Sequence, residues 1–309
     1  MDYKSGNIDI HVHSTASDGS LKPTEILALA QKIGLGALAL TDHDSIDGSK
    51  EILHSDIPES ITFLTGVEIS AQPPGPFTLS GSFHILGYGI GVDDPTLTAV
   101  LEAQQAARKN RNPQIIQRLR DLGIDISLDE VVATSGKAQI GRPHIGSLMI
   151  QKGFVQSMDE AFDRYLGRGK PGYIDKPVIP TQTAIEVIRS ASGIAVLAHP
   201  GLIEIKDPKT FEDLIEELKL LGLTGIEVFY PNHSPSQTGF FENIAKQFNL
   251  IVTGGTDFHG AISPDIGLGV GRGNFSVPYA VFETLSNLLS NLNIYEPESA
   301  VKIKHTRNF

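Results

Sequence analysis

Short apolar runs recur in both outer parts of the chain and predict seven strands. These runs occupy residues 8–13, 37–41, 62–68, 83–89, 194–199, 225–230 and 250–256. Amphipathic helices fit between them, for example at residues 23–33, 181–192, 211–221 and 236–248. Strands that alternate with helices in this way predict an α/β fold with a parallel sheet. Polar residues recur at the C-terminal ends of these strands, which favours a closed barrel over an open sheet.

The middle of the chain has a different pattern. Residues 97–174 contain no convincing strand but several helical stretches, at 99–122, 128–134, 143–152 and 159–166. We expect Pro113 to bend or split the first of these helices. Arginine and lysine residues cluster here, and most of them are expected on solvated helix surface. We interpret residues 98–175 as a helical insertion that divides the barrel into residues 1–97 and 176–295, followed by a tail at residues 296–309.

Composition narrows the class of protein. The 309 residues are 40% hydrophobic and 20% charged, which fits one large domain or one domain with an insertion. No apolar run approaches the ~20 residues of a membrane-spanning helix, and the polar N-terminus does not resemble a signal peptide. We therefore expect a cytoplasmic protein that does not contact membranes.

Charge and cysteine content narrow the chemistry. The chain has no cysteine, so disulfides, thiolate metal sites and cysteine nucleophiles are excluded. Any bound metal must be held by imidazole and carboxylate groups. The formal charge of −11 argues against a surface that binds duplex DNA. It does not exclude a small anionic substrate, because bound cations reverse the local field of an acidic pocket.

Residues that can bind metal gather in six short clusters near the ends of predicted strands. In the first, His11 and His13 lie two residues apart and project to the same side of a strand, and Asp18 follows in the adjoining loop. Alone, each cluster has an ordinary explanation, such as a polar turn or a core histidine. Together on one barrel face they predict a metal site. The other clusters are Thr-Asp-His-Asp with His43, Gly-Val-Glu-Ile-Ser with Glu68, His-Ile-Leu-Gly-Tyr with His84, Ala-His-Pro with His199, and Thr-Asp-Phe-His with Asp257 and His259.

These motifs, in this order, resemble the polymerase and histidinol phosphatase (PHP) superfamily over nearly the whole chain. Within it, the chain resembles the branch of 3′,5′-nucleoside bisphosphate phosphatases and 5′–3′ RNA-trimming enzymes. The resemblance implies a distorted seven-stranded TIM-like barrel with a helical cap and three divalent metal ions, with Mn expected first and Fe or Zn as alternatives. It implies His11, His13, Glu68 and Asp257 as ligands of one ion, Glu68, His84 and His199 of a second, and Asp18, His43 and His259 of a third.

The resemblance also implies a metal-dependent phosphoric monoester hydrolase, in which a hydroxide that bridges two ions attacks phosphorus in line. The implied substrate is a 3′,5′-bisphosphonucleoside, such as adenosine 3′,5′-bisphosphate with AMP as product, or short 5′-phosphorylated RNA. A histidinol phosphate phosphatase is the alternative enzyme. An alternative of another class is a non-catalytic PHP metal-binding module, and the complete ligand set in a chain without polymerase sequence argues against it.

Candidate substrate contacts lie mainly in the insertion. The stretch Gly-Arg-Pro-His-Ile resembles a segment that reaches the phosphate in the nucleotide-phosphatase branch. Arg142 offers a bidentate fork and His144 a hydrogen-bond donor or leaving-group acid, although a surface ion pair would also explain Arg142. Asp42 is expected either to orient a ligand imidazole or only to stabilise a turn. Residues 72–82, rich in Pro and Gly, are expected to form a rim loop. Weaker contact candidates are Lys170, Tyr173 and His233.

Overall fold

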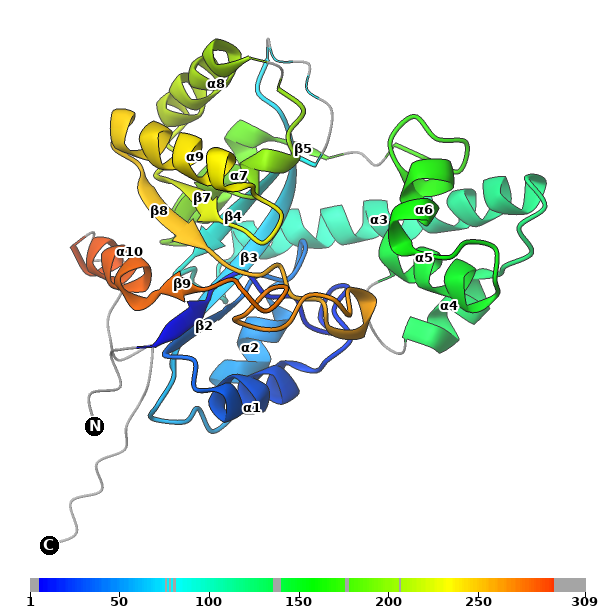
Figure 1. Cartoon of the computed structure of the whole chain (residues 1–309), viewed down its shortest axis with the longest axis horizontal. Helices are drawn as coiled ribbons and strands as arrows, with labels where there is room; N and C mark the ends of the chain where they lie inside the picture. The colour runs from blue at the N-terminus through cyan, green and yellow to red at the C-terminus, as the bar shows by residue number, and fades with distance from the viewer. Residues whose placement is uncertain are drawn as a thin grey trace, which may run out of the picture.

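The computed structural model describes residues 6–75, 77, 79, 82–135, 140–175, 178–205 and 207–291. Its strands follow one path in the order β8-β7-β6-β4-β3-β2-β1-β9, and β5 pairs with β3 outside this path (Figure 1). Part of the expected rim loop and the whole of the expected tail lie outside the described residues. The strands are β1 Asn7–Asp9, β2 Ala37–Leu40, β3 Thr62–Gln72, β4 His84–Tyr88, β5 Ile179–Pro180, β6 Ile194–Leu197, β7 Gly225–Phe229, β8 Ile251–Gly254 and β9 Val277–Pro278.

The sheet is mixed, and the expectation of a wholly parallel sheet is wrong at β4. Strands β1, β2 and β3 are parallel, as are β6, β7 and β8, but β4 runs antiparallel to both β3 and β6. Only residues 73–83 separate β3 from β4, whereas a parallel pair needs a crossover of about a dozen or more residues, usually a helix. The reversal places His84, the first residue of β4, beside Ser70 near the C-terminal end of β3.

The segment after β8 nearly closes the sheet into a barrel. The Asp257 amide donates to the His11 carbonyl at 2.9 Å, and the His13 amide donates to the Phe258 carbonyl at 2.9 Å. On the other side of residues 11–13, the Thr41 amide donates to the Val12 carbonyl at 2.9 Å. Residues 11–13 therefore join both neighbours at the barrel mouth. The expected α/β distorted barrel is confirmed.

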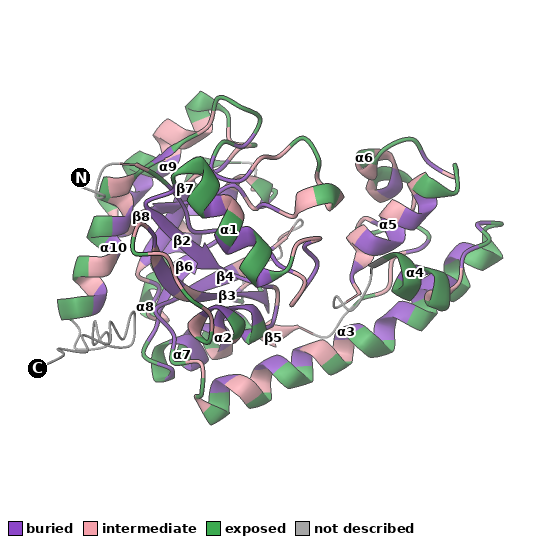
Figure 2. Ribbon diagram, turned by 90° about the horizontal axis from the view of Figure 1, so that it is seen from below, coloured by how far each residue is buried: buried purple, intermediate pink, exposed green. Residues whose placement is uncertain are grey.

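Helices cover the outside of the barrel, and the strands carry its core. Leu86 and Val196 belong to a buried cluster that also receives Leu285 and Leu289 from the last helix. Figure 2 shows the buried residues concentrated on the strands. Among the described residues, no helix is both long and apolar enough to cross a membrane. The helices around the barrel are α1 Pro23–Ile33, α2 Asp47–Leu53, α7 Thr181–Ser190, α8 Pro208–Leu220, α9 Pro235–Gln247 and α10 Tyr279–Asn291, with 3₁₀ turns at Pro200–Leu202 and Gly260–Ile262.

The helical insertion projects to one side of the barrel (Figure 1). Its long helix α3 packs against α7 of the barrel and against α4 of the insertion. The expectation that Pro113 splits this helix is wrong: α3 is one helix, because the proline lies on its exposed face while its neighbour Asn112 is buried. The insertion consists of α3 Pro95–Asp121, α4 Leu128–Ser135, α5 Arg142–Gln151, α6 Met158–Ala161 and a π-helical turn at Phe162–Leu166.

Candidate metal centre

The nine side chains that the sequence analysis selected as metal ligands meet at the mouth of the barrel, around Glu68. One oxygen of Glu68, Oε1, lies 2.7 Å from His84 Nδ1 and 2.8 Å from His199 Nε2. The other, Oε2, lies 2.9 Å from His43 Nδ1 and 3.2 Å from His13 Nε2. Glu68 is fully buried in β3, where this strand pairs with β4. Its two oxygens therefore face histidines from four different segments.

The first group of possible ligands is His11, His13, Glu68 and Asp257. It joins residues that follow β1 with a residue that follows β8. His11 Nε2 and His13 Nε2 lie 3.5 and 3.0 Å from Asp257 Oδ1, and 3.5 and 3.2 Å from Glu68 Oε2. The two histidine rings are 5.3 Å apart. This group has the same members as the set expected for one ion.

The other two groups share members more than the sequence analysis expected. Asp18 lies near His43 and His259, with His259 Nε2 3.4 Å from Asp18 Oδ1, and His13 joins this group. The third group is His43, Glu68 and His84, so His43 stands where His199 was expected. His199 lies outside the three groups, although its Nε2 is 3.2 Å from His84 Nδ1 and 2.8 Å from Glu68 Oε1. His13 and His43 each belong to two groups, so each could contact either of two neighbouring ions.

Unsatisfied atoms support metal binding at this cluster. Besides Nδ1 of His199, five buried side-chain atoms here have no hydrogen-bond partner among the described residues. Buried polar atoms without a partner cost about 1–3 kcal/mol each and are rare in native proteins. Divalent cations would satisfy them, and imidazole with carboxylate suits Mn, Fe and Zn. These atoms are His11 Nε2, His13 Nε2, Asp18 Oδ1, His43 Nδ1 and Glu68 Oε2.

Without an ion, the protonation states match ligand roles at Glu68 and His84 but not at every histidine. Burial alone would lower the pKa of His13, but its hydrogen bonds to Asp257 and Glu68 raise this pKa to about 10, so a cation would have to displace that proton. Burial would raise the pKa of Glu68, but the charges of His43 and His84 hold this pKa well below its ordinary value. Burial lowers the pKa of His84 to about 4. At neutral pH, Glu68 is therefore a carboxylate and His84 a neutral imidazole, which are the forms that bind cations.

Glu227 is a part of the site that the sequence analysis missed. It is fully buried in β7, and its Oε1 accepts a hydrogen bond from His11 Nδ1 at 2.8 Å. Its Oε2 accepts from the His199 amide at 2.7 Å. A carboxylate in this place holds a proton on His11 Nδ1, which would leave Nε2 to bind a cation. Burial would lower the pKa of His11, but the charges of Glu227, Asp257 and Glu68 raise it well above its ordinary value. The only signal in the sequence is an acidic residue inside the apolar run Gly-Ile-Glu-Val-Phe.

Asp42 stabilises the loop that carries Asp18 and does not bind an imidazole directly. Its carboxylate accepts hydrogen bonds from the Ser14 amide at 2.7 Å, the Ser14 hydroxyl at 2.8 Å and the Ser17 hydroxyl at 2.6 Å. The Ser17 hydroxyl lies 3.5 Å from His13 Nδ1. Of the two roles considered for Asp42, these contacts favour the turn.

Two arginines of α3 are buried, as exceptions to the expectation that most charges of the insertion lie on solvated surface. Arg108 donates to Asp44 Oδ2 at 2.9 Å. Arg111 is 7% exposed, and its Nε has no partner among the described residues. Burial, together with the charges of Arg142 and Arg108, lowers the pKa of Arg111 to about 10. The packing of α3 against the barrel buries these side chains, and the sequence pattern does not reveal that contact.

Arg142 and His144 lie in the first turn of α5, next to these arginines. Arg142 Nη1 donates to the Leu166 carbonyl at 2.9 Å, and its guanidinium lies 5.5 and 5.2 Å from the ring centres of Phe162 and Tyr173. His144 is buried, and its Nδ1 accepts from the Gly141 amide at 3.0 Å. The proton of the neutral ring is therefore on Nε2, which leaves this atom as a donor.

The weaker contact candidates have different surroundings. Lys170 is exposed. Tyr173 contacts Arg142 through its ring. Both ring nitrogens of His233 are already used, because Nδ1 donates to the Val228 carbonyl at 2.9 Å and Nε2 accepts from the Gly201 amide at 3.1 Å. His233 therefore has no ring nitrogen left for a substrate.

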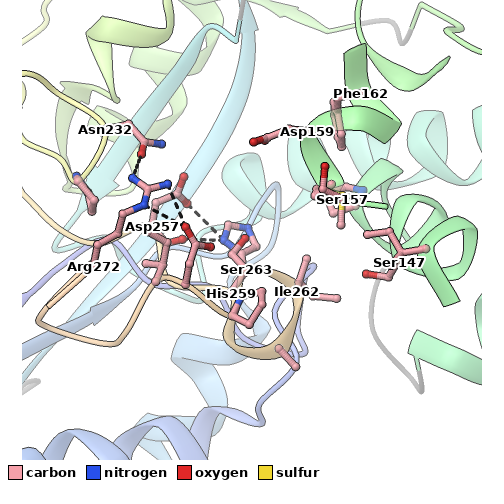
Figure 3. Close-up of a pocket in the computed structure, with 18 of the residues that line it drawn as sticks. Ser147, Ser157, Asp159, Phe162, Asn232, Asp257, His259, Ile262, Ser263 and Arg272 are labelled. Atoms are coloured by element: carbon pink, nitrogen blue, oxygen red, sulfur yellow. Dashed lines mark hydrogen bonds and ion pairs between the residues drawn. The ribbon is translucent and has the colours of Figure 1, made fainter. Parts of the chain in front are cut away.

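A cleft of about 820 Å³ lies between the barrel mouth and the insertion. Figure 3 shows Asp257 and His259 on the barrel side, facing Ser147, Ser157 and Asp159 across the cleft. On the barrel side, Arg272 binds Asp265 at 3.0 Å and also Asn232. The cleft is of the size of small-molecule sites, and it borders the cluster that contains Asp257.

Known proteins resemble this chain over most of its length. The family model described as PHP domain matches residues 9–139. A 5′–3′ exoribonuclease of Haemophilus influenzae is 36% identical over 251 residues, which cover 81% of this chain and 89% of the relative. A 3′,5′-nucleoside bisphosphate phosphatase of Chromobacterium violaceum is 35% identical over 254 residues, which cover 82% and 87%.

Two solved structures share the fold. One, described as an amidohydrolase from Chromobacterium violaceum with bound sulfate, has a TM-score of 0.77 and 34% identity, and the match covers 83% of this chain and 88% of that one. The other, from Bifidobacterium adolescentis, has a TM-score of 0.78 and 26% identity, and the match covers 96% of both chains.

Proposed function

Because this chain belongs to the PHP family of phosphoesterases, we propose that it removes a phosphate monoester from small nucleotides, with 3′,5′-bisphosphonucleosides as substrates. Its relatives include one protein named for nucleoside bisphosphates and another named for RNA. The observation that carries the choice is Arg111, a buried guanidinium of α3 whose Nε has no partner among the described residues. A substrate with a second phosphate would provide that partner.

The proposed metal ligands are the nine side chains around Glu68. Eight of them form the three groups that three divalent ions would occupy, and His199, 2.8 Å from Glu68 Oε1, would join the group of Glu68 and His84. When bound, such ions lower the pKa of water and stabilise negative charge on phosphate oxygens. The protein's part is to orient these ligands. Glu68 is shared between groups, and Glu227 fixes His11 from behind, 2.8 Å from its Nδ1.

His144 is proposed as a hydrogen-bond donor to the substrate. It lies close enough to the metal centre for the charges of Asp18 and His259 to affect its pKa, although burial is the main influence and lowers that pKa. A neutral ring with its proton on Nε2 can donate to a phosphate or leaving-group oxygen. The amide of Gly141, which donates to Nδ1, keeps the ring in this form.

The arginines are proposed to bind the phosphate that is not cleaved. The guanidinium of Arg111 is close enough to Arg108 and Arg142 for their charges to lower its pKa. Such a group of like charges is unfavourable until an anion joins it, and guanidinium groups bind phosphate through paired hydrogen bonds. The scissile phosphate belongs at the metal cluster, so the arginines would receive the second phosphate of a bisphosphonucleoside.

The proposal is tested by comparing substrates on the Mn-loaded protein. We expect the highest kcat/KM for adenosine 3′,5′-bisphosphate, with lower values for short 5′-phosphorylated RNA and for histidinol phosphate. A preference for RNA would move the chain to the exoribonuclease function, and a preference for histidinol phosphate would reject the nucleotide substrate. Metal binding without hydrolysis of any of the three would favour the non-catalytic module.

A further inference from the structure

We propose that Tyr230 is a positioning residue of the metal centre, and that His233 holds it in place. This inference rests on the metal centre proposed above. Tyr230 follows β7 and is 6% exposed, at the border between the cleft and the cluster. It contributes no atom to the three groups of possible ligands. Its contacts nevertheless reach two of the proposed ligands.

The first contact sets the direction of the Asp257 carboxylate. The Tyr230 hydroxyl donates to Asp257 Oδ2 at 3.0 Å. The other oxygen, Oδ1, then faces His13 Nε2 at 3.0 Å. Asp257 has a backbone φ of 55°, a left-handed conformation that is uncommon for residues other than glycine. Among the described residues, Tyr230 is the side chain that bonds to Oδ2, whereas His11, His13 and His259 all face Oδ1.

The second contact is with a ligand of another group. The ring of Tyr230 lies 5.6 Å from the ring of His199, tilted by 56°. Asp257 belongs to the group with His11 and His13, whereas His199 binds Glu68 beside His84. Tyr230 therefore supports ligands proposed for two different ions. A change in its position would alter both.

His233 fixes the ring of Tyr230 from the other side. The two rings lie 5.1 Å apart, and the ring of Phe241 lies 4.9 Å from His233. His233 is itself fixed, since both its nitrogens bind backbone groups, of Val228 and Gly201. A Cβ atom on Gly201 would come within 2.6 Å of the His233 ring. The glycine is therefore required for this contact, and His233 acts through Tyr230 instead of binding substrate.

The test removes only the hydroxyl group, with Tyr230→Phe. We expect the affinity for Mn²⁺, measured by metal analysis after equilibrium dialysis, to fall about 10-fold or more, in the range seen for residues that support metal ligands. We expect kcat to fall in parallel while KM for the nucleotide changes little, because the hydroxyl orients a metal ligand and does not bind the substrate. Tyr279→Phe is the matched control, since the Tyr279 hydroxyl has no hydrogen bond with any described residue.

Each result of this test has a defined meaning. Mn²⁺ affinity and kcat that match the unmodified protein in Tyr230→Phe would overturn the positioning role and leave the phosphoesterase proposal intact. An unmodified protein that binds no divalent metal would instead reject the metal centre itself. Gly201→Ala tests the position of Tyr230 in a second way, through His233. It should displace the His233 ring and lower Mn²⁺ affinity in the same direction, although it leaves the Tyr230 hydroxyl in place.

Discussion

Arg111 is the residue on which the proposed choice of substrate depends. It projects from α3, is almost completely buried, and has two other arginines near it. A buried charge is unfavourable, and burial together with the charges of Arg142 and Arg108 lowers the pKa of Arg111 to about 10. The arrangement favours a ligand that carries negative charge at some distance from the metal cluster.

This account predicts a selective effect of Arg111→Gln. The ratio of kcat/KM for adenosine 3′,5′-bisphosphate to that for adenosine 3′-monophosphate should fall about 10–100-fold, since a hydrogen bond to a charged group contributes about 1.5–3 kcal/mol. Steady-state phosphate release on both substrates measures it. Arg120→Gln is the control, because Arg120 is an exposed arginine of the same helix. An equal loss on both substrates would show that Arg111 does not recognise the second phosphate.

For single residues, the sequence predicts the proposed metal ligands better than the residues that orient them. His11 and His13 form a recognisable motif at one strand end. Glu227, in contrast, is 216 residues from the histidine it orients, so no local pattern connects the two. Tyr230 is 27 residues from Asp257, and the two meet because they follow the paired strands β7 and β8, which no local pattern shows. The grouping of His13 and His43 also depends on ring orientation, which the sequence does not contain.

At the level of elements, β4 and α3 show what periodicity can and cannot predict. The apolar run of β4 predicts a strand but not its direction, which depends on the short connection from β3. Because β4 runs in the opposite direction, its first residue, His84, reaches the barrel mouth. In α3, the exposed position of Pro113 allows one helix to continue where the local rule predicts a break.

The same helix yields a prediction for stability. Pro113→Ala should raise the free energy of unfolding by about 1–3 kcal/mol, because proline is roughly 3 kcal/mol less favourable than alanine inside a helix, and the loss of its restriction on the unfolded chain offsets only about 0.4–1 kcal/mol. Urea denaturation measures the change. Lys109→Ala, on the exposed face of the same helix, should change stability by less than about 0.5 kcal/mol. A less stable Pro113→Ala protein would show that the proline is needed in α3.

For the whole molecule, the proposed substrate site depends on the cleft between the insertion and the barrel. The cleft takes one wall from the insertion and the other from segments that follow β7 and β8. The chain carries a formal charge of −11, yet arginines from α3 and α5 gather beside the carboxylates of the metal centre. An acidic protein can thus present a cationic site to a nucleotide, once divalent ions balance the ligand carboxylates.

The measurement that tests this account most directly is a titration of the metal-free protein with Mn²⁺, in which bound metal and phosphate release from adenosine 3′,5′-bisphosphate are followed together. We predict that release begins as metal binds and reaches its maximum near three ions per chain, one for each group of ligands. A protein that binds this metal and releases no phosphate would contradict the account. Phosphate release that is unaffected by removal of the metal would contradict it equally.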